Sequence, residues 1–211
     1  MPTPQITPVT SNQEKQQTYR EFMVRYSRAM KNGFFLEALL IDYAVMEDRL
    51  RSFLYHMGVF RFRNNPRPNV EEVKQALASI VKEWKAKDEN DQLGVNTITG
   101  KMKIIRCSAK WASFSEGVPE GSMYPAELKN QLQGMDLDRL LKLLGETADW
   151  CKYRNEVIHS LLNKNNSCVD EKTEDMARRG MELAREMDGF VTRLKKGNVL
   201  RKHLDLTVEK Y

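Results

Sequence analysis

Apolar residues recur every three or four positions over several long stretches of the chain, which is the spacing of amphipathic helices. The first stretch covers residues 13–31 and is followed by Asn32-Gly33, a typical helix stop. A second stretch covers residues 35–57, the strongest covers 136–163, and the last covers 170–196. The pattern therefore predicts four main helices.

A fifth helix is predicted after Asn69, because Glu72 follows three residues later as in a capping box, and its pattern fades near Lys87. Residues 88–134 contain five glycines and a weak pattern, so we expect an irregular insertion in which only residues 98–111 form a short helix. The predicted fold class is an all-α bundle of four to five main helices with this irregular insertion.

The two ends of the chain differ from the middle. Residues 1–10 hold three of the seven prolines and little that could be buried, which indicates a flexible leader before a helical domain at 11–196. In the tail, residues 197–211, apolar and polar residues alternate, and this alternation predicts a short strand or an extended arm.

Polar residues interrupt apolar faces of two predicted helices. In the 136–163 stretch, Asn155 falls on one apolar face, and Arg154 falls on the neighbouring face. In the 35–57 stretch, Glu47 lies among apolar residues. An unpaired buried charge costs several kcal/mol, so we interpret Glu47 and Arg154 as ion-pair partners. A purely structural ion pair that fixes the helix register explains the same pattern.

His159 extends this polar cluster. It follows Asn155 by four residues and so shares its helix face, and it lies about 140° around the helix from Arg154. A cation, an amide and an imidazole are thus concentrated within about a turn and a half of one helix.

Composition narrows the class of protein. The 211 residues include 34 Lys and Arg against 29 Asp and Glu, a net charge of +5, with 41% hydrophobic and 30% charged residues. This is an ordinary globular composition with a modest cationic excess. The three cysteines and three histidines lack metal-ligand spacing, so neither a metal site nor another cofactor is predicted. Without a signal peptide or membrane span, we expect a cytoplasmic protein with no membrane partner.

Residues 154–159, with the sequence Arg-Asn-Glu-Val-Ile-His, resemble the Arg-polar-x-x-x-His motif of the HEPN superfamily. That superfamily includes many toxin, antiviral-defence and CRISPR-associated ribonucleases. The motif's place late in a long helix, and the core-facing acid of an earlier helix, are also similar. The resemblance covers residues 13–196 and implies a HEPN-like helical bundle.

The resemblance also implies roles for these residues. Arg154 and His159 would be catalytic and Asn155 would support them. A supporting role for Glu47 rests mainly on its position on an apolar helix face. Family members commonly form homodimers in which two motifs face one cleft, and an inhibitory or activating protein is a further expected partner. His159 is followed by Ser160-Leu161, without the Tyr of one toxin subgroup, so the analogy to toxins silenced at that Tyr is not carried over.

The residue types suit RNA cleavage without a metal. The 2′-hydroxyl of RNA can attack the adjacent phosphate if one group moves protons and a cation offsets the developing charge, roles that suit His159 and Arg154. We therefore predict a metal-independent endoribonuclease in defence or stress, with RNA as its substrate. The alternatives are a non-catalytic interaction module of the same fold and a nucleotide-sensing module that binds phosphate through Arg154.

Basic residues in two other segments are candidates for contacts with RNA phosphates, because basic side chains beside aromatic ones suit single strands. Ordinary solvated surface is the alternative explanation. The candidates are Arg61, Arg63, Arg67, Lys101 and Lys103.

Overall fold

The computed structural model describes residues 12–62, 65–68, 71–81, 95–114, 123–160 and 169–206. The described residues are almost entirely helical, with one antiparallel two-stranded hairpin. In chain order the elements are α1 (Asn12–Lys31), α2 (Phe35–His56), β1 (Phe60–Phe62), β2 (Asn65–Pro68), α3 (Glu71–Ile80), α4 (Ile98–Ser113), α5 (Met123–Gln133), α6 (Leu137–Ser160), α7 (Val169–Lys195), the 3-10 helix η2 (Lys196–Asn198) and α8 (Val199–His203).

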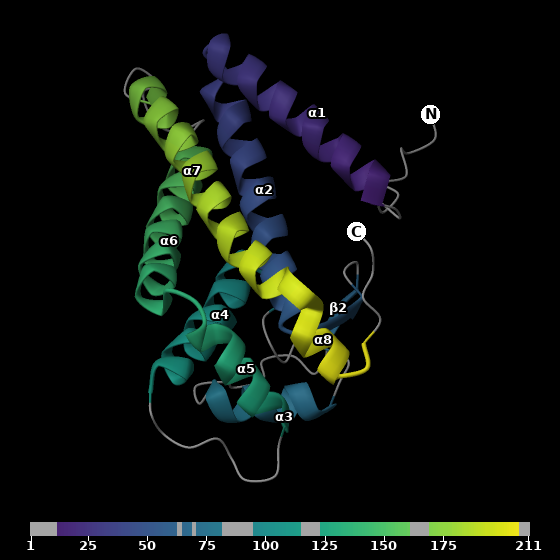
Figure 1. Ribbon diagram of the computed structural model, residues 1–211. Coiled ribbons are helices and arrows are strands. Elements are labelled where there is room, and N and C mark those ends of the chain that lie inside the picture. The colour runs from purple at the N-terminus through teal and green to yellow at the C-terminus, as the bar shows by residue number, and fades with distance from the viewer. Residues whose placement is uncertain are drawn as a thin grey trace.

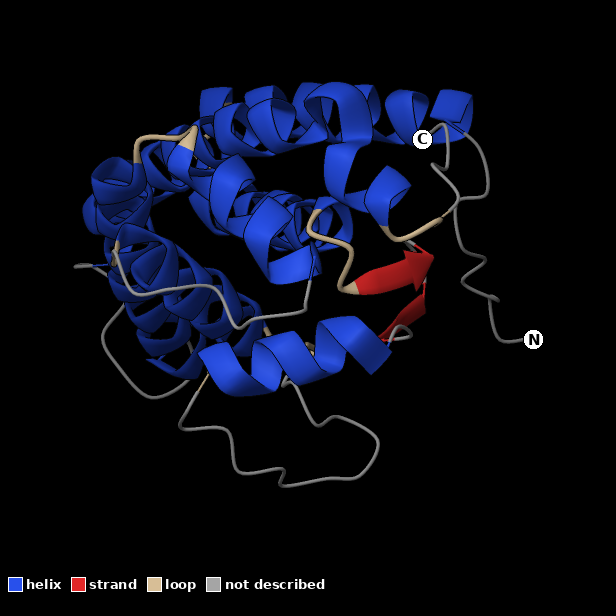
Figure 2. Ribbon diagram, turned by 60° about the horizontal axis from the view of Figure 1, so that its bottom comes forward, coloured by secondary structure: helices blue, strands red, loops and turns tan. Residues whose placement is uncertain are grey.

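The long helices α2 and α7 pack against each other along much of their length (Figure 1). Helix α6 packs against α7, and α1 packs against α2. The shorter helices α3, α4, α5 and α8 gather at one end of the long helices (Figure 1), and the hairpin lies at the edge of the helical body (Figure 2). Helix α2 therefore has neighbours on several sides, and most of its length is buried.

The strongest periodic stretches are confirmed as helices. Those predicted at 35–57, 136–163 and 170–196 correspond to α2, α6 and α7. The start of α2 is as predicted, the other ends that can be compared differ by one residue, and residues 161–163 lie outside the described ranges. The start of α6 is fixed by a cap in which the backbone N–H of Arg139 donates to Oδ1 of Asp136 at 3.0 Å.

The turn between α1 and α2 depends on a glycine. Gly33 has a φ of 75°, and the N–H of Phe34 donates to the carbonyl of Ala29 at 2.8 Å. This is the Schellman arrangement, in which a left-handed residue after the helix satisfies its last carbonyls. The predicted stop at Asn32-Gly33 is thereby explained.

Residues 98–113 form α4, which confirms the short helix expected at 98–111. The expectation that the rest of 88–134 is irregular is wrong at 123–133, which form α5. Helix α4 supplies buried side chains such as Ile105, and α5 supplies Leu128. Pro125 is accommodated because it lies in the first turn of α5, where a missing backbone N–H leaves no helical hydrogen bond unmade. Tyr124 then ties α5 to the end of α2, since its hydroxyl donates to the carbonyl of Met57 at 2.7 Å.

The extended tail predicted after Gly197 is also wrong where it is described, because residues 199–203 form α8. Arg201 on α8 is fully buried, stacks at 3.7 Å over the ring of Tyr55, and donates from Nη1 to the carbonyls of Tyr55 and Phe60. Charge-assisted hydrogen bonds to carbonyls offset part of the cost of burying this guanidinium. The C-terminal helix is therefore anchored to the end of α2.

Several predicted features lie outside the described residues. These are the leader at 1–10, the cap at Asn69, residues 88–94 and the tail beyond 206. Within the described ranges, no helix combines the length and apolar character needed to cross a bilayer.

Asp42 of α2 is buried in the bundle with no hydrogen-bond partner among the described residues. Its exposed fraction is 0%, and neither carboxyl oxygen accepts a hydrogen bond from a described residue. Burial raises the pKa of Asp42 to about 8, although Arg185 acts in the opposite direction. An unfolded chain holds the same carboxyl near its ordinary pKa of about 3.9. The folded state therefore binds one more proton than the unfolded state between those two values, and Asp42 makes stability fall as pH rises through that range.

Asp42→Asn should remove this pH dependence, because an amide has no charge to lose in the folded state. We expect the variant to be more stable than wild type by a few kcal/mol at neutral pH, with a smaller difference toward pH 4. Urea unfolding at a series of pH values measures both effects. Asp138→Asn, at an exposed position of α6, is the matched control and should keep the wild-type profile. Equal pH slopes in wild type and Asp42→Asn would contradict the assignment.

Candidate functional site

The candidate site is built on Trp150 of α6, whose indole lies against α7. A Cβ placed on Gly180 would come within 2.6 Å of Cζ2 of this ring and 2.9 Å of Cβ of Asp42. Only glycine leaves room for α2, α6 and α7 to meet at this point. The indole Nε1–H donates to the carbonyl of Met176 at 2.8 Å, which fixes the orientation of the ring.

Tyr43 of α2 connects this anchored indole to Arg154. The rings of Tyr43 and Trp150 are stacked, with centroids 6.4 Å apart and an interplanar angle of 26°. The guanidinium of Arg154 lies 4.2 Å from the centroid of the Tyr43 ring, well within the range of a cation–π contact. A fixed aromatic surface thus holds the cation in place.

The remaining motif residues lie at the exposed end of α6. Nη1 of Arg154 donates to Oδ1 of Asn155 at 3.0 Å, and both Asn155 and His159 are exposed. Arg154 itself is half-buried, its Nε has no hydrogen-bond partner among the described residues, and it makes no ion pair with any described acid. Its positive charge is therefore not neutralised by any side chain that the structure describes.

The predicted ion pair between Glu47 and Arg154 is not formed. Glu47 instead pairs with Lys101 of α4, whose Nζ lies 3.2 Å from Oε1 of Glu47. The carboxylate of Glu47 still acts on this region, because it raises the pKa of Tyr43 together with burial, the larger cause. No contact among the described residues supports a direct role of Glu47 in positioning Arg154.

Of the five candidate RNA-contacting residues, the side chains of Lys101 and Lys103 are described. Lys101 is fully buried, so its assignment to RNA phosphates is wrong, whereas Lys103 is exposed on α4. Arg61 lies in β1 and Arg67 in β2, and Arg63 lies outside the described residues.

Cys151 lies beside the site but is not a nucleophile at neutral pH. Burial raises the pKa of its thiol to about 11, and nearby Arg154 only partly opposes this shift. The reactive form of cysteine is the thiolate, which is then scarce near pH 7. The polar side chains left at this end of α6 include the half-buried guanidinium of Arg154 and the exposed imidazole of His159.

Tyr43, Trp150 and Gly180 have roles at the site that the sequence did not reveal. Tyr43 was visible as a member of the same apolar face as Glu47, yet a tyrosine on a buried face is most simply a core residue. Gly180 stood among apolar residues of the last predicted helix, where a glycine costs about 1 kcal/mol relative to alanine. Such an unfavourable glycine was the one signal of a close helix contact.

Across the described ranges, no three His, Cys, Asp or Glu side chains come together as a metal site would require. In comparisons with known proteins, the chain matches no family model, no curated protein and no solved structure.

Gly180→Ala tests whether the close contact holds the site together. The added methyl group would collide with Trp150, so we expect a net loss of about 1–2 kcal/mol in unfolding free energy, despite the better helix propensity of alanine. The emission of Trp150 should shift as the ring moves. Denaturant unfolding and tryptophan fluorescence measure the two effects.

Gly189→Ala is the matched control on the same helix, because nothing lies within 4 Å of its added methyl group. It should raise stability by up to about 1 kcal/mol. If both variants gain stability, the contact at Gly180 is not tight.

Proposed function

We propose that this protein is a metal-independent endoribonuclease of HEPN type. The observation that carries the proposal is the placement of Arg154, which is held over Tyr43 without a described counter-ion and lies on the same last turns of α6 as the exposed His159. An arginine fixed by stacking is prepared to bind an anion, since little side-chain freedom remains to be lost on binding.

The two side chains suit the two demands of RNA cleavage. A guanidinium forks onto phosphoryl oxygens and offsets the charge that grows on them. An imidazole changes protonation near neutral pH, so it can take the proton of the 2′-hydroxyl as this oxygen attacks phosphorus and return a proton to the 5′-oxygen as the P–O5′ bond breaks. Asn155 accepts a hydrogen bond from Arg154 and so helps to orient it. The products would carry a 2′,3′-cyclic phosphate and a 5′-hydroxyl.

Cleavage is tested by incubating the purified protein with mixed RNAs in EDTA. Wild type should cut RNA and leave DNA of the same sequence intact, whereas Arg154→Ala and His159→Ala should each cut at least about a hundredfold more slowly. Circular dichroism should show both variants folded. Arg193→Ala on α7 and His203→Ala on α8 are matched controls and should cut normally.

The mechanism is wrong if His159→Ala keeps full activity or if EDTA abolishes cleavage. A folded wild-type protein that leaves every RNA intact would instead favour a non-catalytic interaction module or a nucleotide-sensing module.

We further propose that the active form is a homodimer that covers the site. Leu40 lies one turn before Tyr43 on the same face of α2 and is 43% exposed, which leaves an apolar side chain in solvent one helical turn from the ring that contacts Arg154. A second copy would bury this side chain and exclude water from the guanidinium, which strengthens its attraction for phosphate.

Leu40→Glu should disrupt that contact. We expect wild type to be a dimer at micromolar concentration by light scattering, and the variant to be a folded monomer with little RNA cleavage. Val24→Glu changes an apolar side chain that is 52% exposed on α1 and should leave the dimer intact. A monomeric wild type with full activity would exclude a composite site.

A further inference from the structure

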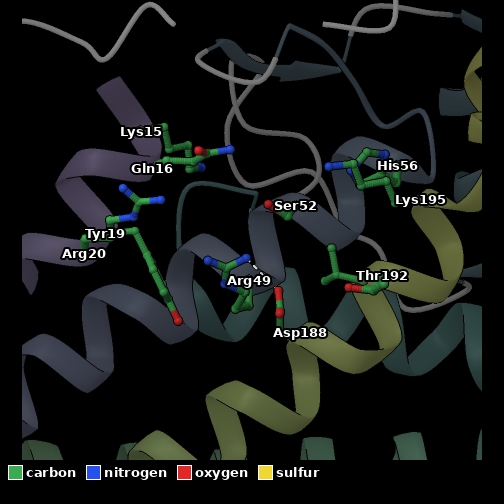
Figure 3. A pocket seen from close by; sticks show the side chains of 11 residues that line it. Lys15, Gln16, Tyr19, Arg20, Arg49, Ser52, His56, Asp188, Thr192 and Lys195 are labelled. Carbon is green, nitrogen blue, oxygen red and sulfur yellow. Dashed lines mark hydrogen bonds and ion pairs between the residues drawn. The ribbon is translucent and has the colours of Figure 1, made fainter. Parts of the chain in front are cut away.

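A basic cavity lies between α1, α2 and α7 and has no part in the proposed cleavage (Figure 3). Its volume is about 370 Å³, the size of a small-molecule site. Four of its 11 lining residues carry a full positive charge and one carries a negative charge. The cationic residues are Lys15 and Arg20 from α1, Arg49 from α2 and Lys195 from α7.

Arg49 is fixed in the wall of the cavity. Its guanidinium lies 4.9 Å from the centroid of the Tyr19 ring, and Nη1 lies 2.6 Å from Oδ1 of Asp188, the one acid of the lining (Figure 3). Its buried Nε has no hydrogen-bond partner within the described chain. Nη2 of Arg49 also lies 3.6 Å from Oδ2 of Asp48. Ring stacking and these two ion pairs keep the guanidinium in one orientation before any ligand arrives.

The other cations leave an excess of positive charge. Lys15 pairs at 2.5 Å with Asp48, which lies just outside the lining. Arg20 and Lys195 form no ion pair with any residue that the structure describes. They belong to different helices, α1 and α7, that line the cavity. Two cations without counter-ions beside one cavity repel each other, and an anion between them would relieve that repulsion.

Two buried polar side chains also line the cavity. Ser52 is 1% exposed and His56 is 5% exposed, and Figure 3 shows both among the lining side chains. Hydroxyl and imidazole groups beside arginine and lysine are typical ligands of phosphate oxygens. The lining therefore combines charge and hydrogen-bonding groups suited to phosphate.

The cavity is separate from the Arg154 site. Ser52 follows Tyr43 by nine residues, which places it about half a turn around α2, on the opposite face, and about 13 Å further along the helix. A ligand in the cavity would not occupy the position of a phosphate bound to Arg154.

We propose that this cavity binds a small molecule through a phosphate or pyrophosphate group, with Arg20, Arg49 and Lys195 as its cationic contacts. The assignment goes beyond the proposed ribonuclease function and does not depend on it. Two or three cations around one cavity match the charge of pyrophosphate, and the limited volume favours a small ligand over a polymer.

Titration calorimetry with pyrophosphate at about 0.1 M salt tests the proposal. Wild type should bind one pyrophosphate saturably, with a Kd below about 1 mM. The double variant Arg20→Gln/Lys195→Gln should bind at least about tenfold more weakly. Arg28→Gln/Arg193→Gln makes the same change of net charge on the same two helices outside the cavity, and it should bind as wild type does.

Asp188→Asn supplies a test in the opposite direction. Removing the one acid from the lining should tighten pyrophosphate binding several-fold, because the ligand no longer competes with that carboxylate for Arg49. Titrations with inorganic phosphate and with ADP then show whether the free ion or a phosphorylated organic molecule is preferred.

Three outcomes would overturn the proposal. The first is the absence of saturable pyrophosphate binding up to about 5 mM. The second is an equal loss of affinity in the two double variants, which would mean binding to overall charge. The third is a short RNA that displaces pyrophosphate and binds more tightly, because the cavity would then hold the backbone of a polymer.

Discussion

The close meeting of α2, α6 and α7 at Gly180 is the constraint on which the candidate site depends. At this position a hydrogen atom replaces a side chain, so the indole of Trp150 and the stem of Asp42 can both approach the backbone of α7. The indole stacks on the ring of Tyr43, and the same ring contacts the guanidinium of Arg154. A single glycine in the bundle therefore sets the position of a cation at the surface.

Burying charged groups costs free energy, and Arg201, Lys101 and Asp42 meet this cost in different ways. Arg201 is compensated by carbonyl oxygens and an aromatic ring. Lys101 is compensated by Glu47, which is only partly buried, so the pair keeps some solvation on one side. Asp42 accepts no hydrogen bond from the described residues and is accommodated by holding its proton, as its raised pKa requires. The contacts of Arg201 hold α8 against the end of α2, and the ion pair of Lys101 connects α4 to α2. Asp42 connects no elements, and its burial lowers the stability of the fold at neutral pH.

The long helices could be predicted because each keeps one face apolar over many turns, so that apolar residues recur every three or four positions in the sequence. α2, α6 and α7 meet that condition, whereas α5 and α8 are too short for the period to be clear. The same pattern placed Glu47 and Arg154 on buried faces but could not name their partners. A periodic face shows which way a side chain points on its own helix, and the partner depends on which helix packs there. In the structure Arg154 stacks on the ring of Tyr43, and Glu47 forms an ion pair with Lys101.

Helix α2 presents Tyr43 to the Arg154 site on one face and Ser52 to the basic cavity on the opposite face. Along the helix these residues are about 13 Å apart, more than the Debye length of about 8 Å at physiological salt. Direct electrostatic attraction between a ligand in the cavity and charges at the exposed Arg154 site is therefore largely screened. Any coupling between the two would pass through movement of the helices that they share, α2 and α7. Because α2 is held against α7 at Gly180, where the space is already filled, such a movement would displace Trp150 and with it Tyr43.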